Sequence, residues 1–289
     1  MYEQCLADWQ EDRVVVLIKQ LSPWEAARAR GLSLETGIAL DAPLVPTLEA
    51  FERLSRRAEG MGEAVYAVGG GVAADAAKFV ASTLGLPLVC VPTALSCIAF
   101  FTPYVLLRQL AGMTQAPAVP PDGVLLDLAL IRAAPTKCRA SGIVDVLSMA
   151  TACLDWLEED RQGKLPPEQR YAAPIAQMAQ SLVEIGLECA PSAHRGEWDG
   201  LRALARCLAL TAHLGTVVGH ERFRIGSAHA FAEQAEQSTA GASWRGELLP
   251  SPFTYAQRLA AGVLHAASRQ GQDIERLRRA LTTETESKT

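Results

Sequence analysis

The 289-residue sequence lacks the features that mark several large classes of protein. Charged residues make up only 20% and aromatic residues 6% of it, against 49% hydrophobic residues, a balance that excludes an intrinsically disordered chain. No uninterrupted apolar run approaches the roughly 18 residues of a membrane-spanning helix, so no membrane partner is expected. The acidic start MYEQCLADWQEDR has no basic segment followed by an apolar one and predicts no signal peptide.

Cysteine pairs and basic clusters are also missing. The seven cysteines are scattered, odd in number and form no CxxC motif, which argues against a disulfide framework and a cysteine-bound zinc site. The 27 Lys and Arg residues are interspersed among 32 Asp and Glu residues, so no phosphate-binding surface for nucleic acid is expected. These features predict a globular cytoplasmic protein with no nucleic-acid partner.

The first half of the sequence alternates short apolar segments with amphipathic ones. Ser22 and Pro23 are expected to be the N-cap and the first residue of one helix. We predict strands at 14–18, 36–40, 64–68, 86–91 and 124–127, and helices at 24–30, 47–58 and 72–84. This alternation is typical of a parallel, Rossmann-like sheet with helices on both faces.

After about residue 129 the β-branched runs disappear and helix-forming residues dominate almost to the end. A length of 289 residues is typical of about two domains. We therefore expect an α/β domain at residues 1–128 and an all-α domain at residues 129–289.

The strongest local signal is the segment AVYAVGGGVAADAAK at 64–78. A predicted strand ends in Gly69, Gly70 and Gly71, and a helix begins at once. Glycine lets the backbone approach a ligand closely, and the N–H groups at a helix start favour an anion. The pattern predicts a phosphate or pyrophosphate site, or else a tight turn that needs positive φ. Asp75 and Lys78 lie on one face of the helix start, where they could equally form a surface ion pair.

Three further motifs follow the glycine segment: VPTALS at 91–96, a segment at 134–156 that contains GIVDVL at 142–147, and RIGSAH at 224–229. Together the four motifs resemble the superfamily of iron-containing alcohol dehydrogenases, glycerol dehydrogenases and sn-glycerol-1-phosphate dehydrogenases, with 3-dehydroquinate synthases as more distant members. The resemblance covers residues from about 64 to 236. It implies a dehydroquinate synthase-like fold, in which residues 1–128 bind a nucleotide and residues 129–289 bind a metal ion and the substrate.

The resemblance implies a cofactor and a metal. In the family an NAD(P) pyrophosphate lies on the glycine loop, which carries over to Gly69, Gly70, Gly71, Asp75, Lys78, Thr93 and Ser96. A divalent zinc or iron ion is held by one Asp and two His, of which Asp145 and His229 match the first two. Such an ion polarises the substrate hydroxyl and favours hydride transfer to the nicotinamide.

The third ligand is where the sequence departs from the family. The nearest segment is YAQRLAAG at 255–262; if Gly262 fixes the register, Tyr255 replaces the histidine, and a slip of one residue puts Thr254 there. A phenol is a poor zinc ligand, because it must first lose a proton with a pKa near 10. Glu233, one turn beyond His229, is either a substitute ligand or part of a solvated helix face. A metal site is therefore doubtful, and Tyr255 joins Asp145 and His229 as a candidate catalytic residue.

Other departures and candidates concern the substrate. Ile98 stands where the polyol branches carry Asp, so an apolar wall replaces a polar one. Arg222 and Arg224 are candidates for binding a phosphate or carboxylate, or else belong to an exposed helix start. His220 is either a substitute ligand or base, or has no role in the site. Lys19, after the first long strand, is a weak candidate for contacting a 2′-phosphate.

These observations favour a divergent NAD(P)-dependent, metal-assisted oxidoreductase that interconverts an alcohol and a carbonyl compound in the cleft between the domains. Two alternatives stay open. One is a non-redox lyase, cyclase or transferase that acts on a phosphorylated or nucleotide-like ligand. The other is a non-catalytic relative whose cleft is filled by Phe100, Phe101 and Tyr255. The expected partners are a small-molecule substrate and, by resemblance, further copies of this chain.

Overall fold

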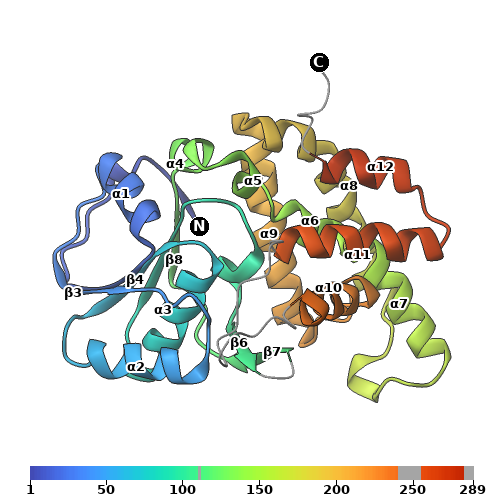
Figure 1. Cartoon of the computed structure of the whole chain (residues 1–289), viewed down its shortest axis with the longest axis horizontal. Helices are drawn as coiled ribbons and strands as arrows, with labels where there is room; N and C mark the ends of the chain where they lie inside the picture. The colour runs from blue at the N-terminus through green and yellow to red at the C-terminus, as the bar shows by residue number, and fades with distance from the viewer. Residues whose placement is uncertain (110–111, 240–254, 283–289) are drawn as a thin grey trace.

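The computed structural model describes residues 1–109, 112–239 and 255–282. A six-stranded parallel sheet with helices on both faces lies on one side of the molecule, and helices form the other side (Figure 1). The strands are β1 (Tyr2–Glu3), β2 (Val15–Lys19), β3 (Thr36–Asp41), β4 (Ala64–Gly69), β5 (Leu88–Pro92) and β8 (Gly123–Leu126), in the order β1-β8-β5-β4-β2-β3. The predicted fold class, an α/β part followed by an all-α part, is confirmed.

Helices and short 3-10 turns connect and cover these strands. In the first half they are η1 (Leu6–Asp8), α1 (Leu21–Ala29), α2 (Leu48–Ala58), α3 (Gly71–Leu84) and η2 (Ile98–Phe101). The second half contains α4 (Leu128–Ala133), α5 (Thr136–Arg139), α6 (Ile143–Leu147), α7 (Met149–Arg161), η3 (Pro167–Gln169), α8 (Ala173–Arg195), α9 (Trp198–Val218), α10 (Ser227–Thr239), α11 (Tyr255–Arg269) and α12 (Ile274–Leu281).

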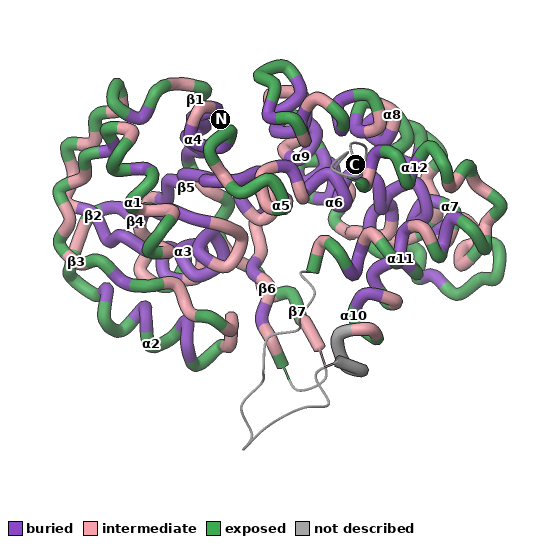
Figure 2. The backbone as a smooth tube through the Cα atoms, turned by 45° about the horizontal axis from the view of Figure 1, so that its top comes forward, coloured by how far each residue is buried: buried purple, intermediate pink, exposed green. Residues whose placement is uncertain are grey.

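The β-branched run of β2 is buried on both faces, as its sequence predicts. Val15 and Leu17 belong to the core on the α1 side of the sheet, which includes Ala27. Val16 and Ile18 belong to the core on the opposite face, under α2 and α3. Because successive side chains of a strand point to opposite faces, a continuous apolar run is what a doubly covered strand requires. Figure 2 shows this buried sheet with exposed residues on the helices around it.

The chain changes direction across the sheet at the β2–β4 pair. From β2 it moves to β3 at one edge, then returns to β4 and continues through β5 to β8 on the other side. In open parallel sheets ligands bind at the carboxyl ends of the strands at such a switch point. Here those ends are Lys19 and Gly69, so the glycine loop (residues 69–71) lies where the topology favours a ligand.

The first helix begins earlier than predicted. Ser22 and Pro23 were expected at its start, but α1 begins at Leu21, with Gln20 as N-cap. Trp24 N–H donates to the Gln20 carbonyl at 2.9 Å, which closes the first turn. Pro23 is tolerated because the first N–H groups of a helix have no intrahelical partner. Only the backbone of Gln20 takes part in this turn, so its side chain is free to bind the glycine loop.

An antiparallel hairpin, β6 (Tyr104–Gln109) and β7 (Gly112–Pro117), was not predicted. It lies between the two sides of the molecule in both views (Figures 1 and 2). Its strands bury few side chains: no residue of β7 is buried, and in β6 only Val105 and Leu107 are. Contacts with α3 hold the hairpin in place. These contacts join residues far apart in the sequence, so the local sequence pattern does not predict them.

On the helical side, α9 is long and apolar enough, by length and composition alone, to cross a membrane. Half of its most apolar 18-residue window is buried inside the protein. Leu204 and Leu208 are fully buried in the same core as Leu182 and Val183 of α8. This packing is that of a core helix, whose apolar residues pack against neighbouring helices.

Glu11 links the segment before β2 to the sheet. Its carboxylate accepts hydrogen bonds from the Arg13 guanidinium, at 2.7 Å from both Nε and Nη2, and from the Tyr66 hydroxyl of β4. The bonds from Arg13 outweigh the desolvation of the carboxylate and lower the pKa of Glu11 to about 2, from 4.5 for an ordinary glutamate. A carboxyl group whose pKa is depressed on folding stabilises the folded state above its unfolded pKa.

We therefore expect Glu11→Gln to lower the free energy of unfolding at pH 7 by about 1–2 kcal/mol. In the wild type this contribution is fully present above about pH 4.5 and is lost as the pH falls towards 2. The difference between the two proteins should accordingly shrink over that interval. Urea unfolding of both proteins at several pH values measures it, and parallel pH profiles would contradict the assignment.

Candidate functional site

The three glycines of the glycine loop meet different surroundings. Gly69 has φ +151°, and a Cβ there would lie 2.7 Å from the Gln20 side-chain oxygen. A Cβ on Gly71 would lie 2.8 Å from the Cys97 sulfur. A Cβ on Gly70 would meet nothing closer than 3.5 Å. The chain's own packing thus requires Gly69 and Gly71, whereas Gly70 faces space that a ligand can use.

Helix α3 starts directly behind the loop and supplies backbone donors. Its first N–H groups lack intrahelical acceptors, and one of them, from Gly70, donates to the Gln20 side-chain oxygen at 2.8 Å. The rest of the first turn has the geometry that binds a phosphate at a helix N-terminus. Sequence reasoning missed Gln20, whose only signal was a polar residue between β2 and a helix.

Asp75 and Lys78 form a buried ion pair, so the surface pair considered from the sequence is wrong. Lys78 is 0% exposed, and its Nζ lies 2.8 Å from an Asp75 oxygen and 2.8 Å from the Thr102 hydroxyl. It also donates to the Tyr104 carbonyl, while Leu106 N–H donates to Asp75 at 3.4 Å. The pair therefore braces the β6–β7 hairpin against α3, and nucleotide contact by either residue stays a prediction.

The loop after β5 joins the two sides of the site. Thr93 N–H donates to the Gly69 carbonyl at 3.2 Å, and half-buried Ser96 follows in the same loop. Gly142 N–H donates to the Leu95 carbonyl at 2.8 Å. A Cβ on Gly142 would lie 2.8 Å from that carbonyl oxygen and 3.0 Å from the nitrogen of Cys97. Only glycine therefore allows α6, which carries Asp145, to approach the loop beside the glycines.

Asp145 lies at the centre of this contact and is 4% exposed. Ile98 N–H donates to its carboxylate at 3.2 Å, so the residue that departs from the family pattern contacts Asp145 through its backbone. Burial raises the pKa of the Asp145 carboxyl, and the charge of Arg224 opposes that rise. Cys97 lies in the same loop, and burial raises the pKa of its thiol to about 12, which keeps it protonated at neutral pH.

His229 reaches the site from α10. The start of that helix is held by Asp155, whose carboxylate accepts from both the N–H and the hydroxyl of Ser227 at 2.7 Å. A Cβ on Gly226 would lie 2.5 Å from the same carboxylate oxygen, which explains the glycine in the RIGSAH motif. His229 is 6% exposed, and neither of its ring nitrogens has a hydrogen-bond partner among the described residues. Burial and the neighbouring Arg224 lower its pKa to about 3, which leaves a neutral imidazole.

Arg224 is buried in the site, 5% exposed, rather than part of an exposed helix start. Its Nε donates to Glu221 at 2.9 Å and its Nη2 to the Tyr104 hydroxyl at 3.2 Å. Ser148, which follows Asp145 by three residues, donates to the Arg224 carbonyl at 3.3 Å. Arg222, by contrast, turns away to Glu159 and Gln169.

Tyr255 begins α11, which touches α10 next to His229. A Cβ on Gly262 would lie 2.3 Å from the Ala228 carbonyl oxygen, so this glycine fixes the contact of the two helices. Tyr255 lies two turns earlier on the same helix, and its phenol is within electrostatic reach of Asp145 and Arg224. Thr254, the alternative from a slipped register, lies outside the described residues.

The assembled residues do not fit the divalent metal that the resemblance implies. Within residues 1–109, 112–239 and 255–282, no three His, Cys, Asp or Glu side chains come together as a metal site. Glu233 is exposed and completes none. Partial desolvation and the charge of Asp145 raise the pKa of the Tyr255 phenol, which weakens it further as a ligand. The buried guanidinium of Arg224 adds a positive charge within electrostatic reach of Asp145 and His229.

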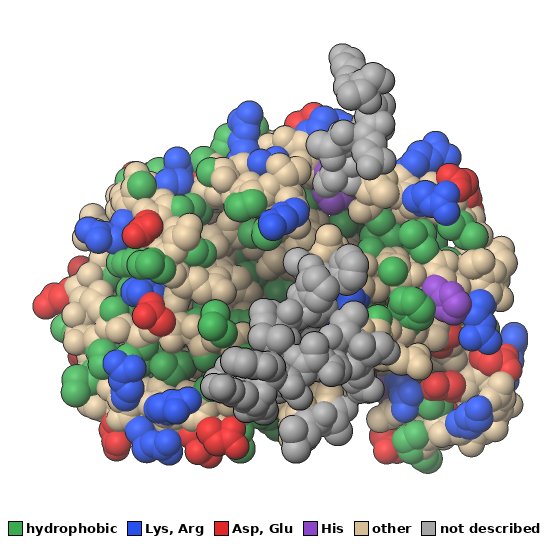
Figure 3. Space-filling model, in the orientation of Figure 1, with side chains coloured by type: hydrophobic (Ala, Val, Ile, Leu, Met, Phe, Trp, Pro, Cys, Tyr) green, Lys and Arg blue, Asp and Glu red, His purple; other side chains and the backbone are tan. Residues whose placement is uncertain are grey.

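A cavity of about 450 Å³ adjoins these groups, a volume that suits a small molecule. Its walls come from the hairpin and the end of α9: Pro103, Tyr104, Gln115, Gln169, Gly215, Thr216, Gly219, His220 and Glu221. Tyr104 and Glu221 are also the partners of Arg224. On the face shown in Figure 3, charged side chains lie mostly around the edge of the molecule. Phe100 packs in the sheet-side core and does not fill this space.

His220 lines the cavity, but its ring is already engaged. Its Nδ1 accepts from Arg222 N–H at 3.3 Å, and its ring lies edge-on to Trp156 with 5.2 Å between centroids.

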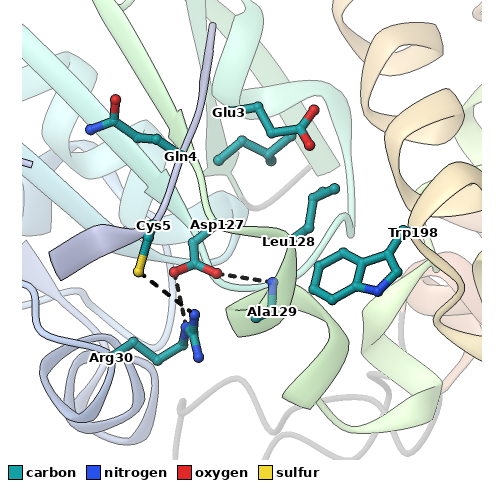
Figure 4. Close-up of a pocket in the computed structure, with 9 residues that line it drawn as sticks. Glu3, Gln4, Cys5, Arg30, Asp127, Leu128, Ala129 and Trp198 are labelled. Carbon is teal, nitrogen blue, oxygen red and sulfur yellow. Dashed lines mark hydrogen bonds and ion pairs between the residues drawn. The ribbon is translucent and has the colours of Figure 1, made fainter. Parts of the chain in front are cut away.

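A second pocket, of about 260 Å³, lies at the ends of β1 and β8 (Figure 4). Asp127 dominates it but is fully engaged: it accepts from Arg30 at 2.9 Å and from the N–H groups of Ala129, Leu130 and Leu6 at 2.9, 3.0 and 3.2 Å. The other carboxylate in the pocket, Glu3, pairs with Arg202 at 2.7 Å. Both carboxylates of this pocket are thus paired with arginines of the chain, so we assign the pocket no part in the candidate site.

The role of Asp155 in orienting His229 can be tested by substitution. We expect Asp155→Ala to lower the free energy of unfolding by about 1–2 kcal/mol, because it removes the acceptor for the N–H and hydroxyl of Ser227 and for the side-chain amide of Gln270. Asp155→Asn keeps an acceptor oxygen and should lose less than half as much. Thermal unfolding of the three proteins measures the effect, and equal losses in both variants would contradict a capping role.

The sequence of this chain is similar to those of known dehydrogenases. The family model for iron-containing alcohol dehydrogenase matches residues 2–135. Glycerol-1-phosphate dehydrogenase [NAD(P)+] of Thermococcus kodakarensis is 29% identical over 238 residues, which cover 81% of this chain and 63% of the relative. The enzyme of the same description from Cenarchaeum symbiosum is 33% identical over 218 residues, covering 75% and 56%. The chain thus spans less than two thirds of the length of these relatives.

Solved structures support the fold. A probable glycerol dehydrogenase from Sinorhizobium meliloti 1021 superposes with a TM-score of 0.66 at 20% identity, covering 95% of this chain and 76% of that one. An iron-containing alcohol dehydrogenase from Thermotoga maritima gives 0.61 at 15% identity, covering 93% and 79%. With its matched sequence over residues 2–135 and its similar fold, this chain is a divergent relative of the iron-containing alcohol dehydrogenases.

Proposed function

We propose that this chain is a divergent NAD(P)-dependent oxidoreductase that interconverts an alcohol and a carbonyl compound between the glycine loop and the Asp145, Arg224 and His229 cluster. The observation that carries the proposal is the contact of Gly142 with the loop after β5. It brings the end of β4, where a nucleotide phosphate fits, beside the buried polar cluster. The names of the relatives, which include NAD(P)+, support the same reaction class.

In this proposal the start of α3 and the open side of Gly70 hold the nucleotide phosphates. Thr93 and Ser96, at the end of β5, lie on the path from that loop to Asp145 and would line the nicotinamide side. A bound nicotinamide supplies or accepts the hydride. The chain's own part is to exclude water from the buried cluster and to hold the substrate oxygen, for which Arg224 offers donors and His229 a neutral ring nitrogen.

Asp41 favours NAD over NADP. It ends β3, about twenty residues beyond the end of β2, the place from which an acid contacts the ribose 2′-hydroxyl in related folds. Its side chain is 77% exposed and pairs with Lys19, which was the weak candidate for a 2′-phosphate. The sequence reasoning overlooked Asp41 because it considered only the loop after the first long strand.

The cavity beside Tyr104 limits the substrate to a small molecule with several polar groups. Gln115, Gln169 and Thr216 offer hydrogen bonds along its wall. The incomplete metal site favours one other candidate function: a non-redox reaction on a phosphorylated ligand that the glycine loop would bind. We also propose a cytoplasmic protein that assembles with further copies of itself and whose other partner is its small-molecule substrate.

Nucleotide binding can be tested at Gly70. Gly70→Ala adds one methyl group with ordinary contacts inside the protein, so it should leave the melting temperature unchanged. The same group occupies the space proposed for a phosphate, so we expect NADH affinity to fall by about tenfold. Fluorescence titration of NADH and NADPH measures the affinities.

The matched control is Gly123→Ala, at the amino end of β8 and so at the opposite end of the strands from the glycine loop, where a Cβ also meets only contacts of 3.4 Å or more. It should bind NADH like the wild type. If the wild type binds neither nucleotide, the oxidoreductase proposal fails; if Gly70→Ala binds as tightly as the wild type, the phosphate position is wrong.

Asp41→Ala should raise the affinity for NADPH relative to NADH by about tenfold. The change removes a carboxylate that repels a 2′-phosphate and releases Lys19 to attract one. Glu35→Ala, which removes an exposed carboxylate just before the other end of β3, should leave the ratio unchanged. The same titrations decide, and an unaltered ratio in Asp41→Ala would remove this residue from the nucleotide site.

A further inference from the structure

We infer that the guanidinium of Arg224 takes the electrostatic place of the family's divalent metal ion, so that this chain is metal-independent and binds a substrate oxygen through Arg224. The metal independence follows from the side chains around Asp145 and His229. Only the identity of the bound group, the oxygen of an alcohol or carbonyl compound, rests on the proposed function.

Arg224 is built into the fold. Its guanidinium is held by Glu221 at 2.9 Å and by the Tyr104 hydroxyl at 3.2 Å. Its backbone N–H donates to the Glu221 carbonyl at 2.9 Å, and its carbonyl accepts from Ser148. A charge 95% removed from solvent is tolerated only where it is paired and hydrogen-bonded, as it is here. These contacts hold the positively charged guanidinium of Arg224 in place between the hairpin, α6 and α10.

Arg224 is also a neighbour of the positions that match the family's metal ligands. The Ser148 hydroxyl lies 2.9 Å from the carbonyl oxygen of Asp145 and 3.3 Å from that of Arg224, and His229 follows Arg224 by five residues, in the first turns of α10. A divalent ion placed among these residues would be repelled by the buried guanidinium, because like charges repel strongly in a medium of low polarity. Arg224 and a metal are therefore alternatives at this site.

Arg224 also has donors to spare for a ligand. A guanidinium carries five N–H groups, and among the described residues Glu221 and Tyr104 take two of them. Guanidinium groups bind carbonyl oxygens, alkoxides and anionic oxygens strongly when water is excluded. The cavity of about 450 Å³ reaches both partners of Arg224, which gives a small substrate access to that region. The function supplied elsewhere by a metal, polarising the substrate oxygen, is thereby available from the chain itself.

The inference can be tested by attempting to restore the metal. Tyr255→His supplies the third ligand, and it is combined with either Arg224→Met, which removes the charge, or Arg224→Lys, which keeps it. We expect the Met combination to bind one Zn²⁺ per chain about 100-fold more tightly than the Lys combination, because only the latter retains the repelling charge. Competition with a chromophoric zinc chelator measures the affinities.

A second test uses the wild-type protein and so does not depend on whether the double variants fold. Purified from cells grown with added zinc and iron, it should contain far less than one metal ion per chain by elemental analysis. A stoichiometric metal that is lost in His229→Ala would overturn the inference, as would equal zinc affinities of the Met and Lys combinations. Because the readout is metal binding, it is independent of nucleotide binding, which the Gly70 experiment tests.

Discussion

The candidate site depends on one close backbone contact. Gly142 packs so tightly against the segment 95–97 that any side chain there would collide with main-chain atoms. This contact sets α6, and with it Asp145, against the loop that follows β5, whose own start is bonded to Gly69. The distance between the glycine loop and the buried polar cluster is therefore set by backbone atoms. Since main chains deform less readily than side chains, the scaffold can persist while the side chains within it change.

That separation explains how the superfamily's architecture persists around an altered centre. Gly69, Gly226 and Gly262 all make contacts that a Cβ would disrupt, and each holds one element of the site. Within this frame the residues that match the resemblance's ligand segments include a tyrosine, Tyr255, in place of a histidine, and Arg224 is a buried positive charge. A monopositive guanidinium with directed donors differs from a divalent ion in geometry, but both stabilise negative charge on an oxygen.

Much of the fold was predictable from local patterns. β2 is a continuous β-branched run because both its faces are buried, and α3 follows glycines because its start needs positive φ and close packing. The start of α1 was misplaced because Ser22 and Pro23 suit a helix N-terminus locally, whereas β2 runs straight into the helix. The β6–β7 hairpin escaped prediction because its stability comes from Lys78, which is distant in sequence.

The sequence by itself determined the fold class and the glycine loop, and it singled out Asp145 and His229, because each lies in a contiguous motif with a recognisable spacing. Only the tertiary structure decided what surrounds them. It buried Asp75 with Lys78, placed Gln20 on the glycine loop, and brought Arg224 into the electrostatic field of Asp145 and His229. Burial and the pairing of charges depend on residues far apart in the chain, so a linear pattern cannot reveal which cation a site contains.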